Sequence, residues 1–442
     1  MIMGSEQQYI ELYEQARQMI CEHSSDVMNA ERDEAFSHFK AQGFPSKKVE
    51  RYKYTDIARL FEPNYGLNLN RLTIPVDPYK TFSCDVPNLS TSLYFVVNDS
   101  FYSQVLPSAH LPEGVVIGSL KEHASELYNR LAAKDNDAIS NLNTMLAQDG
   151  LYVYVPRNVV VDRAIQVINI LRSDVDLMFN RRVLIILEEG AAIKMLFCDH
   201  AADDRNFLST QVIEAYVGEN AQLDLYCLEE THHKNVRMSN VYIDQKANSR
   251  VTHNVITLHN GTTRNKLDLT FSGEGAECHC YGCVIADKQQ HVDNNTLITH
   301  KVPHCTSNEL YKYVLDDKAV GAFAGRVLVE HGAQKTTSQM TNQNLTATKE
   351  ARMYTQPMLE IYADDVKCAH GSTVGQLNDA ALFYMRQRGI SLDEAKMLLQ
   401  NAFINEVIDK MELAPLRDRL HHLVEKRFRG ELNKCEGCKL CK

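Results

Sequence analysis

The chain has 442 residues, 44% hydrophobic and 24% charged, with 12 Cys and a formal net charge of -10. This composition is typical of a globular protein of roughly two or three domains, and the negative charge argues against nucleic acid as the main partner. The first residues lack a basic stretch followed by an apolar core, and apolar runs such as VLIIL at 183–187 are far too short to cross a membrane. We therefore expect a cytoplasmic protein whose cysteines are free thiols or ligands of metal and sulfur.

Residues 1–149 are expected to form a mostly helical N-terminal domain. The segment 5–42 is rich in Glu, Gln, Ala and Met, which favour helices. Its apolar residues recur near helical spacing: Ile10, Tyr13, Ala16 and Ile20. YFVVND at 94–99 is typical of a short strand, and a helical pattern returns at 121–147.

Residues 150–376 predict a parallel β-helix. Segments such as IQVINIL and TQVIEAYVGENAQLDLYCL alternate with period two and are separated by Gly, Asn and Asp turns. A turn with a small residue recurs at intervals of 30, 26, 29, 57 and 33 residues: Ala191, Ala221, Ala247, Ala276 and Ala333, with a further slot near Val366. A repeat of ~28 residues without intervening helices favours a stacked β-solenoid, whose ends need caps. A two-sheet sandwich is the structural alternative.

Residues 377–442 are expected to form a C-terminal helical domain with a cysteine-rich tail. Asn378 can cap a first helix, and Ser391 with Glu394 forms a capping box that opens a second. The predicted apolar stripe of the second helix is Ala395, Leu398, Leu399, Ala402, Phe403 and Val407. Pro415 suits the first turn of a third helix. Its predicted apolar residues are Leu416, Leu420, Leu423 and Val424.

The stretch CAHGSTVGQL at 368–377 holds the first candidate site. Cys368 and His370 are two residues apart, and in an extended segment such side chains point the same way. A thiolate and an imidazole could then reach one metal ion or one sulfur species together. The alternative is a packed thiol beside a hydrogen-bonded histidine at a strand end.

Two further cysteine groups are candidates. In CHCYGC, Cys278 and Cys280 share one face of a strand while His279 points away, so with Cys283 they converge only if the strand breaks. We interpret this group as solenoid interior and rim. The tail KCEGCKLCK has the C-x2-C-x2-C spacing of iron–sulfur ligands, but a cubane cluster needs a fourth ligand. Its thiols are candidate metal ligands: Cys435, Cys438 and Cys441.

Several enzyme classes lack their motifs in this sequence. There is no G-x-x-x-x-G-K-[ST] loop for nucleotide hydrolysis, no G-x-G-x-x-G between a strand and a helix, and no G-x-S-x-G elbow. A β-helix enzyme acting on polysaccharides would need paired carboxylates in a groove. Asp364 and Asp365 are adjacent, and in a strand they would point to opposite faces.

Long segments of the C-terminal half resemble the SufB/SufD family of scaffold proteins for iron–sulfur cluster assembly. They are GRVLVEHGAQKTTSQMTNQNL (325–345), TQPMLEIYADDVKCAHGSTVGQLNDAALFYMRQRGIS (355–391) and EAKMLLQNAFINEVID (394–409). GFPSKKVERYKYTD at 43–56 is similar to that family's G-x-P and W-K-Y-T signature, with Tyr52 where Trp is usual. The run HGSTVGQL has the form expected of the SufD branch.

The resemblance implies a right-handed parallel β-helix between helical domains, acting as a non-catalytic scaffold. It implies a complex with a SufB-like paralogous scaffold and with a SufC-like ABC-type ATPase that docks on the C-terminal helices. His370 would face a cysteine of the SufB-like partner and bind iron or a nascent cluster, with Cys368 as a secondary thiol. The iron or iron–sulfur cluster would be transient at the subunit interface, with none tightly bound to the isolated chain, and the complex would support iron acquisition. The resemblance gives no role to the tail cysteines.

Two alternatives of other kinds stay open at this point. The chain could be a self-contained metal-binding or redox protein that uses CHCYGC and the tail. The chain could also be a β-helix enzyme of the polysaccharide lyase or hydrolase type. Apart from these two alternatives, the isolated chain could form a homodimer through an exposed solenoid edge.

Overall fold

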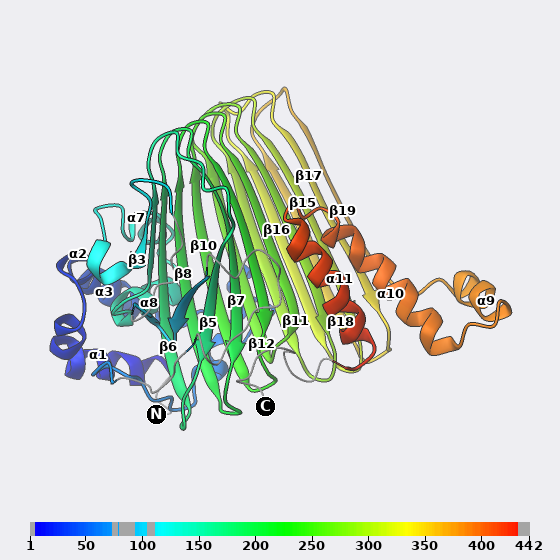
Figure 1. Ribbon diagram of the computed structural model, residues 1–442, viewed down its shortest axis with the longest axis horizontal. Helices are drawn as coiled ribbons and strands as arrows, with labels where there is room; N and C mark the ends of the chain where they lie inside the picture. Colours follow the sequence, from blue (N-terminus) through cyan, green and yellow to red (C-terminus); the bar gives the residue numbers. More distant parts are fainter. Residues whose placement is uncertain (1–4, 73–77, 79–92, 104–110, 432–442) are drawn as a thin grey trace.

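A computed structural model describes residues 5–72, 78, 93–103 and 111–431 of the protein. Its body is a parallel β-helix made of two facing sheets (Figure 1). The first sheet contains β1 (Leu93–Val97), β2 (Ser100–Phe101), β5 (Ile165–Leu171), β7 (Ala192–Ala201), β9 (Gln222–Glu230), β11 (Arg250–His259), β13 (Glu277–Ala286), β15 (Thr306–Leu315), β17 (Thr337–Thr346) and β19 (Lys367–Gly375). The second contains β3 (Val116–Ser119), β4 (Leu151–Val155), β6 (Leu177–Leu187), β8 (Phe207–Val217), β10 (Asn235–Gln245), β12 (Thr262–Phe271), β14 (His291–His300), β16 (Val320–Val329) and β18 (Arg352–Ile361).

From β4 onward the chain alternates between the sheets, and each strand pairs in parallel with the strand two places further along. This arrangement confirms the predicted solenoid and rules out the antiparallel sandwich. The inward-facing residues of both sheets form one continuous apolar core between them. Because each coil covers the next, the period-two alternation of the sequence becomes an alternation between interior and exterior.

One stack of turns sets the register of the coils. In each turn a residue with positive φ precedes a small buried residue, as Asn220 (φ 57°) precedes Ala221. Hydrogen bonds from backbone amides to backbone carbonyls join successive turns. They show which small buried residues stack on one another: Ala191, Ala221, Ser249, Ala276, Cys305 and Thr336. The predicted slots at Ala247 and Ala333 are therefore wrong by two and three residues. Cys305 occupies a further position of this kind within the interval of 57 residues that separates Ala276 from Ala333. The turn requires a small buried side chain, which need not be alanine.

Helices cover the outer faces of both sheets. The N-terminal ones are α1 (Ser5–Glu22), α2 (Asp26–Ala30), α3 (Arg32–Gln42), α4 (Ile57–Leu60), α6 (Leu120–His123), α7 (Arg130–Asp135) and α8 (Ala138–Leu146). Buried residues of α1, α3 and α8 pack with Met178, Leu208 and Met238 on the second sheet. The helical pattern at 121–147 is divided because Asn129 (φ 63°) and Asn136 (φ 53°) adopt left-handed conformations at either end of α7. Of the helices in the described ranges, none has the length and apolar character needed to cross a membrane.

The C-terminal helices begin where their caps predict. The side chains of Asn378 and Ser391 accept hydrogen bonds from backbone amides at the starts of α9 (Asp379–Gln387) and α10 (Leu392–Ile408). In α11 (Ala414–Phe428), all four predicted apolar residues are buried against the first sheet. The stripe predicted for α10 is partly wrong, because its buried residues are Ala395, Met397, Ile404, Val407 and Ile408. Leu398 is 39% exposed, since α10 carries apolar residues on more than one face and packs only part of them against β13, β15 and α11.

Candidate functional site

The last strand of the first sheet, β19, carries Cys368 and His370. It pairs with β17 along one edge, where Cys368 lies opposite Ser338 and His370 lies opposite Met340. Ser338 and Met340 are both buried, and Met340 belongs to the interior core. Residues at the same register position of neighbouring parallel strands face the same side. Cys368 and His370 therefore share the interior-facing side of β19, as the two-residue spacing predicts.

The two side chains differ in burial because the solenoid ends here. Cys368 is half-buried against the core, whereas His370 is exposed. Burial raises the pKa of the Cys368 thiol above its ordinary value, although a hydrogen bond with the backbone of Ser338 opposes this rise. The isolated chain consequently holds Cys368 as a neutral thiol near pH 7. A bound metal ion would favour the thiolate.

Both residues continue columns that run through the interior. The column of Cys368 passes through Val251, Cys278, Ser307 and Ser338. That of His370 passes through His253, Cys280, Glu309 and Met340. Every earlier member of the two columns is at least 98% buried. The candidate site is thus the accessible end of an interior that already carries thiol, imidazole and carboxyl groups.

The terminal coil presents two strand edges and several apolar side chains. In the described part of the chain, β18 pairs only with β16 and β19 only with β17. A hydrogen bond of 2.7 Å between the hydroxyls of Thr355 and Ser372 links β18 to β19 across the coil. Large apolar side chains around them remain exposed: Tyr354, Ile361, Tyr362 and Val374. Unpaired edges beside exposed apolar residues are typical of a surface that another protein covers.

The segment at 43–56 packs on the outer face of the second sheet and extends from β12 to the terminal coil. Arg51 forms an ion pair with Asp268 on β12. The Tyr54 ring stacks on Tyr354 of β18 with a centroid distance of 4.8 Å and an interplanar angle of 17°. Tyr52 is buried, and its ring lies 4.0 Å from the guanidinium carbon of Arg264. The segment therefore connects the N-terminal helices to the last coil.

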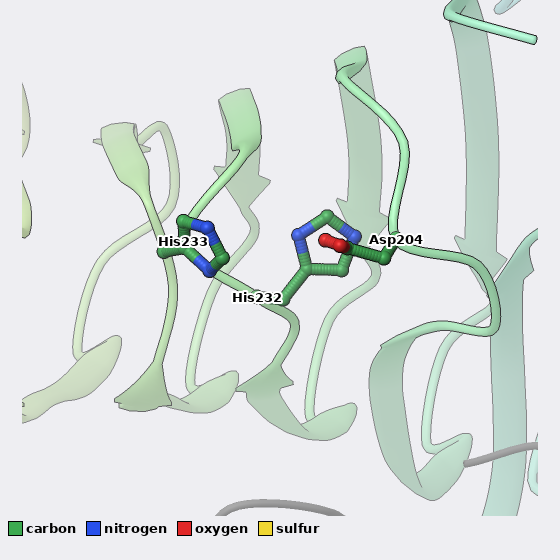
Figure 2. Close-up of side chains that lie close together, drawn as sticks. All are labelled: Asp204, His232 and His233. Carbon is green, nitrogen blue, oxygen red and sulfur yellow. The ribbon is translucent and has the colours of Figure 1, made fainter. Parts of the chain in front are cut away.

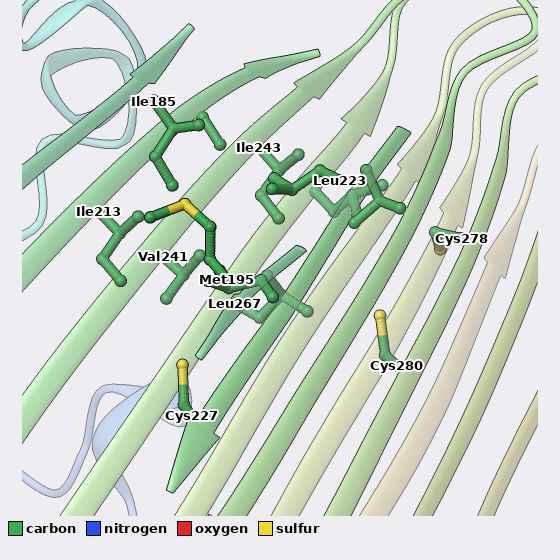
Figure 3. Close-up of a cluster of buried hydrophobic side chains, with 14 of the residues drawn as sticks. Ile185, Met195, Ile213, Leu223, Cys227, Val241, Ile243, Leu267, Cys278 and Cys280 are labelled. Atoms are coloured by element: carbon green, nitrogen blue, oxygen red, sulfur yellow. The ribbon is translucent and has the colours of Figure 1, made fainter. Parts of the chain in front are cut away.

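The side chains of CHCYGC do not all converge on one point, although those of Cys278 and Cys280 contact each other. Strand β13 runs unbroken through the motif, and Cys278 and Cys280 lie in the interior core (Figure 3). Cys283 packs on the other face, beneath α10 and α11. His279 points outward and contacts the carboxylate of Glu277 at 2.6 Å. The side chains of this motif lie partly in the solenoid interior and partly at its rim, as predicted. They therefore do not form one set of metal ligands.

Asp364 and Asp365 lie in the turn between β18 and β19 and not in a strand, so the prediction of opposite strand faces is wrong. Asp365 forms an ion pair with Lys335 of the preceding turn. The three cysteines of the tail, Cys435, Cys438 and Cys441, lie outside the described residues.

Fold and site together define a class: a helix-capped β-solenoid whose last coil offers a thiol and an imidazole at an open end. Comparison with known families gives the particular member of this class. Residues 170–403 match the family model described as SUF system FeS cluster assembly, SufBD core domain, and residues 3–167 match the SufBD protein N-terminal region. The chain belongs to the SufBD family of iron–sulfur cluster assembly proteins.

Individual relatives agree with this assignment. An iron-sulfur cluster assembly SufBD family protein of Synechocystis is 29% identical over 395 residues, which cover 86% of each chain. The iron-sulfur cluster assembly protein SufD of Escherichia coli is 25% identical, covering 88% of this chain and 90% of that protein. SufD of Bacillus subtilis is 24% identical, covering 86% and 89%.

Proposed function

We propose that this chain is the SufD-like, non-catalytic scaffold subunit of a cytoplasmic SUF assembly complex. A SufB-like paralogue covers the open end of the solenoid, and iron or a nascent iron–sulfur cluster is held as cargo at the interface. The observation that carries the proposal is the common face of Cys368 and His370 beside two unpaired strand edges. The likeness to SufD proteins along most of their length supports the choice of this branch.

His370 supplies a borderline nitrogen ligand and Cys368 a soft sulfur ligand, a set suited to iron. Because one strand offers only these two side chains, the remaining ligands must come from the covering subunit or from sulfide. This requirement accounts for a site at an interface. It also means that the isolated chain has an incomplete site.

The first experiment compares His370→Ala with Thr373→Ala in the complete complex. Thr373 is exposed on the opposite face of β19, so it is a matched control. Neither substitution should change the free energy of unfolding by more than ~0.5 kcal/mol, because both side chains are exposed. We expect His370→Ala to abolish cluster formation while Thr373→Ala leaves it intact. Normal assembly by a folded His370→Ala complex would reject the site.

The second experiment tests the covering subunit. Val374 is 50% exposed on the interior-facing side of β19, so Val374→Lys places a charge where the SufB-like scaffold would pack. We expect co-purification with that scaffold to be lost, while the circular dichroism of the isolated chain is unchanged. Undiminished complex formation would exclude this end of the solenoid as the interface. Size-exclusion chromatography of the same two proteins also tests whether the isolated chain forms a homodimer through this edge.

The ATPase is assigned to a different surface. Helix α9 buries none of its residues and projects away from the solenoid (Figure 1), exposing 64% of Phe383 and 55% of Tyr384. Leu392 and Leu398 add exposed apolar area on α10. We assign the docking of a SufC-like ATPase to this surface. Phe383→Asp should lose the ATPase from the purified complex but keep the SufB-like scaffold, whereas retention of the ATPase would refute this assignment.

A further inference from the structure

Two neighbouring turns, far from the terminal coil, bring three metal-ligating side chains together. Asp204 lies between β7 and β8, and His232 and His233 lie between β9 and β10. One ligand atom from each side chain lies within 4.8 Å of the other two. Figure 2 shows the His232 ring between His233 and Asp204. Across the described ranges, no other three His, Cys, Asp or Glu side chains meet this criterion.

The solenoid holds these turns side by side. Strand β7 pairs with β9 as far as His200 and Glu230, and β8 pairs with β10 from Phe207 and Asn235 onward. The two turns therefore leave and re-enter the sheets at matching positions. The backbone of this cluster is fixed by the same ladders that build the core, so its side chains meet without a long mobile loop.

We propose that Asp204, His232 and His233 form a surface site for a divalent first-row transition ion. Two imidazoles and one carboxylate are the ligands that Zn²⁺ and Fe²⁺ accept, whereas Ca²⁺ and Mg²⁺ prefer oxygen ligands alone. Asp204 and His233 are exposed, so water can complete the coordination. This site goes beyond the proposed function, because it lies on other turns and needs no second subunit.

Binding must displace contacts that now hold the cluster. The ammonium of Lys234 lies 2.9 Å from a carboxylate oxygen of Asp204. Nε2 of His232 lies 2.8 Å from the carbonyl oxygen of Asp203, and Nδ1 accepts a hydrogen bond from the amide of Lys234 at 3.2 Å. An ion therefore replaces the ammonium at Asp204 and one hydrogen bond of His232. Metal bonds of about 2.0–2.2 Å also require the ligand atoms to move closer than 4.8 Å.

The Lys234 ammonium thus competes with a metal ion for the Asp204 carboxylate. Substitution of Lys234 should therefore change the affinity for the ion if the cluster is a metal site, and should not change it if the cluster is only structural. Removal of its charge frees the Asp204 carboxylate and removes repulsion of the ion. A surface ion pair of this kind is weak, so Lys234→Met should tighten binding by about two- to fivefold. His233→Ala removes a ligand from an exposed position and should weaken binding by about tenfold or more.

The experiment titrates Zn²⁺, and separately Co²⁺ as a spectroscopic probe, into the full chain carrying Cys435→Ser, Cys438→Ser and Cys441→Ser. These three changes prevent the tail thiols from binding the ion. His331→Ala is the matched control, since His331 is an exposed histidine outside the cluster. We expect one equivalent to bind, more weakly in His233→Ala, more tightly in Lys234→Met and unchanged in His331→Ala. Absence of stoichiometric binding, or binding that His233→Ala leaves unchanged in a folded chain, would overturn the proposal.

Discussion

Glu309 provides a sharp test of the polar interior beneath the candidate site. It lies on β15 in the column that ends at His370, and its side chain is 1% exposed. Burial raises its pKa from 4.5 to about 7, and an interaction with Thr296 opposes this only in part. We predict that Glu309→Gln removes a pH-dependent loss of stability from the protein, because Gln resembles the neutral carboxyl at every pH.

The direction of this pH dependence follows from the pKa values of the Glu309 carboxyl in the unfolded and the folded chain. Below pH 4.5 the carboxyl is protonated in both the folded and the unfolded chain, so it imposes no penalty. Between pH 4.5 and about 7 the unfolded chain ionises first, and the free energy of unfolding falls as the pH rises. Above that range the penalty is constant at about 3 kcal/mol, from a pKa difference of about 2.5 units at 1.36 kcal/mol each. In a chain of this length, a penalty of about 3 kcal/mol lowers Tm by about 3 °C.

The assay measures thermal unfolding of both proteins near pH 4.5 and near pH 8.5. The advantage of Glu309→Gln over the parent should be about 3 kcal/mol larger at the higher pH. Any constant packing effect of the amide cancels in this comparison. Glu274→Gln, at an exposed turn position, is the control and should show no such change. If the Glu309→Gln and parent curves run parallel with pH, the buried neutral carboxyl is refuted.

Two further predictions concern stability. Asp199 is buried and bridges two buried arginines at 2.6 and 2.7 Å, which hold its pKa at about 2. Asp199→Ala should lower the free energy of unfolding by about 3–5 kcal/mol in denaturant titrations, because both buried guanidinium groups lose their ion pair with this carboxylate, and a loss below ~1 kcal/mol would contradict this. Tyr54→Ala removes the stacking on Tyr354, worth about 0.5–1.5 kcal/mol, and should accelerate amide hydrogen exchange at 50–55 but not in β9. Equal exchange at 50–55 would show that the segment does not depend on this contact.

The solenoid could be predicted from sequence because its determinants are local. Strand alternation depends on neighbouring residues, and the caps of α9 and α10 depend on Asn378 and Ser391 alone. The register of the turns could not be read from alanines, because Ser249, Cys305 and Thr336 satisfy the same packing requirement. Leu398 shows the same limit: an apolar residue on a helix does not reveal which face a neighbour covers.

The candidate metal ligands on the turns were missed for a related reason. Asp204 and the pair His232 and His233 come from different coils, and only the β7–β9 and β8–β10 ladders bring them together. The adjacent histidines indicate a metal site only when the coil period is known, because the period gives the position of a third ligand one coil earlier in the chain. The shared side of Cys368 and His370 needed no such knowledge, since two residues within one strand determine it.

Position along the stack, more than residue type, separates core from site. His253 and His370 occupy the same column, yet His253 is 2% exposed and its pKa is lowered to about 4 by burial, so it stays neutral and enclosed. His370 has the same orientation on the strand but no coil beyond it. The imidazole of His370 is accessible because the repeat stops, and the same imidazole would be buried in the core if one more coil followed. The covering subunit that we propose would supply the neighbour that the last coil lacks and every earlier coil has.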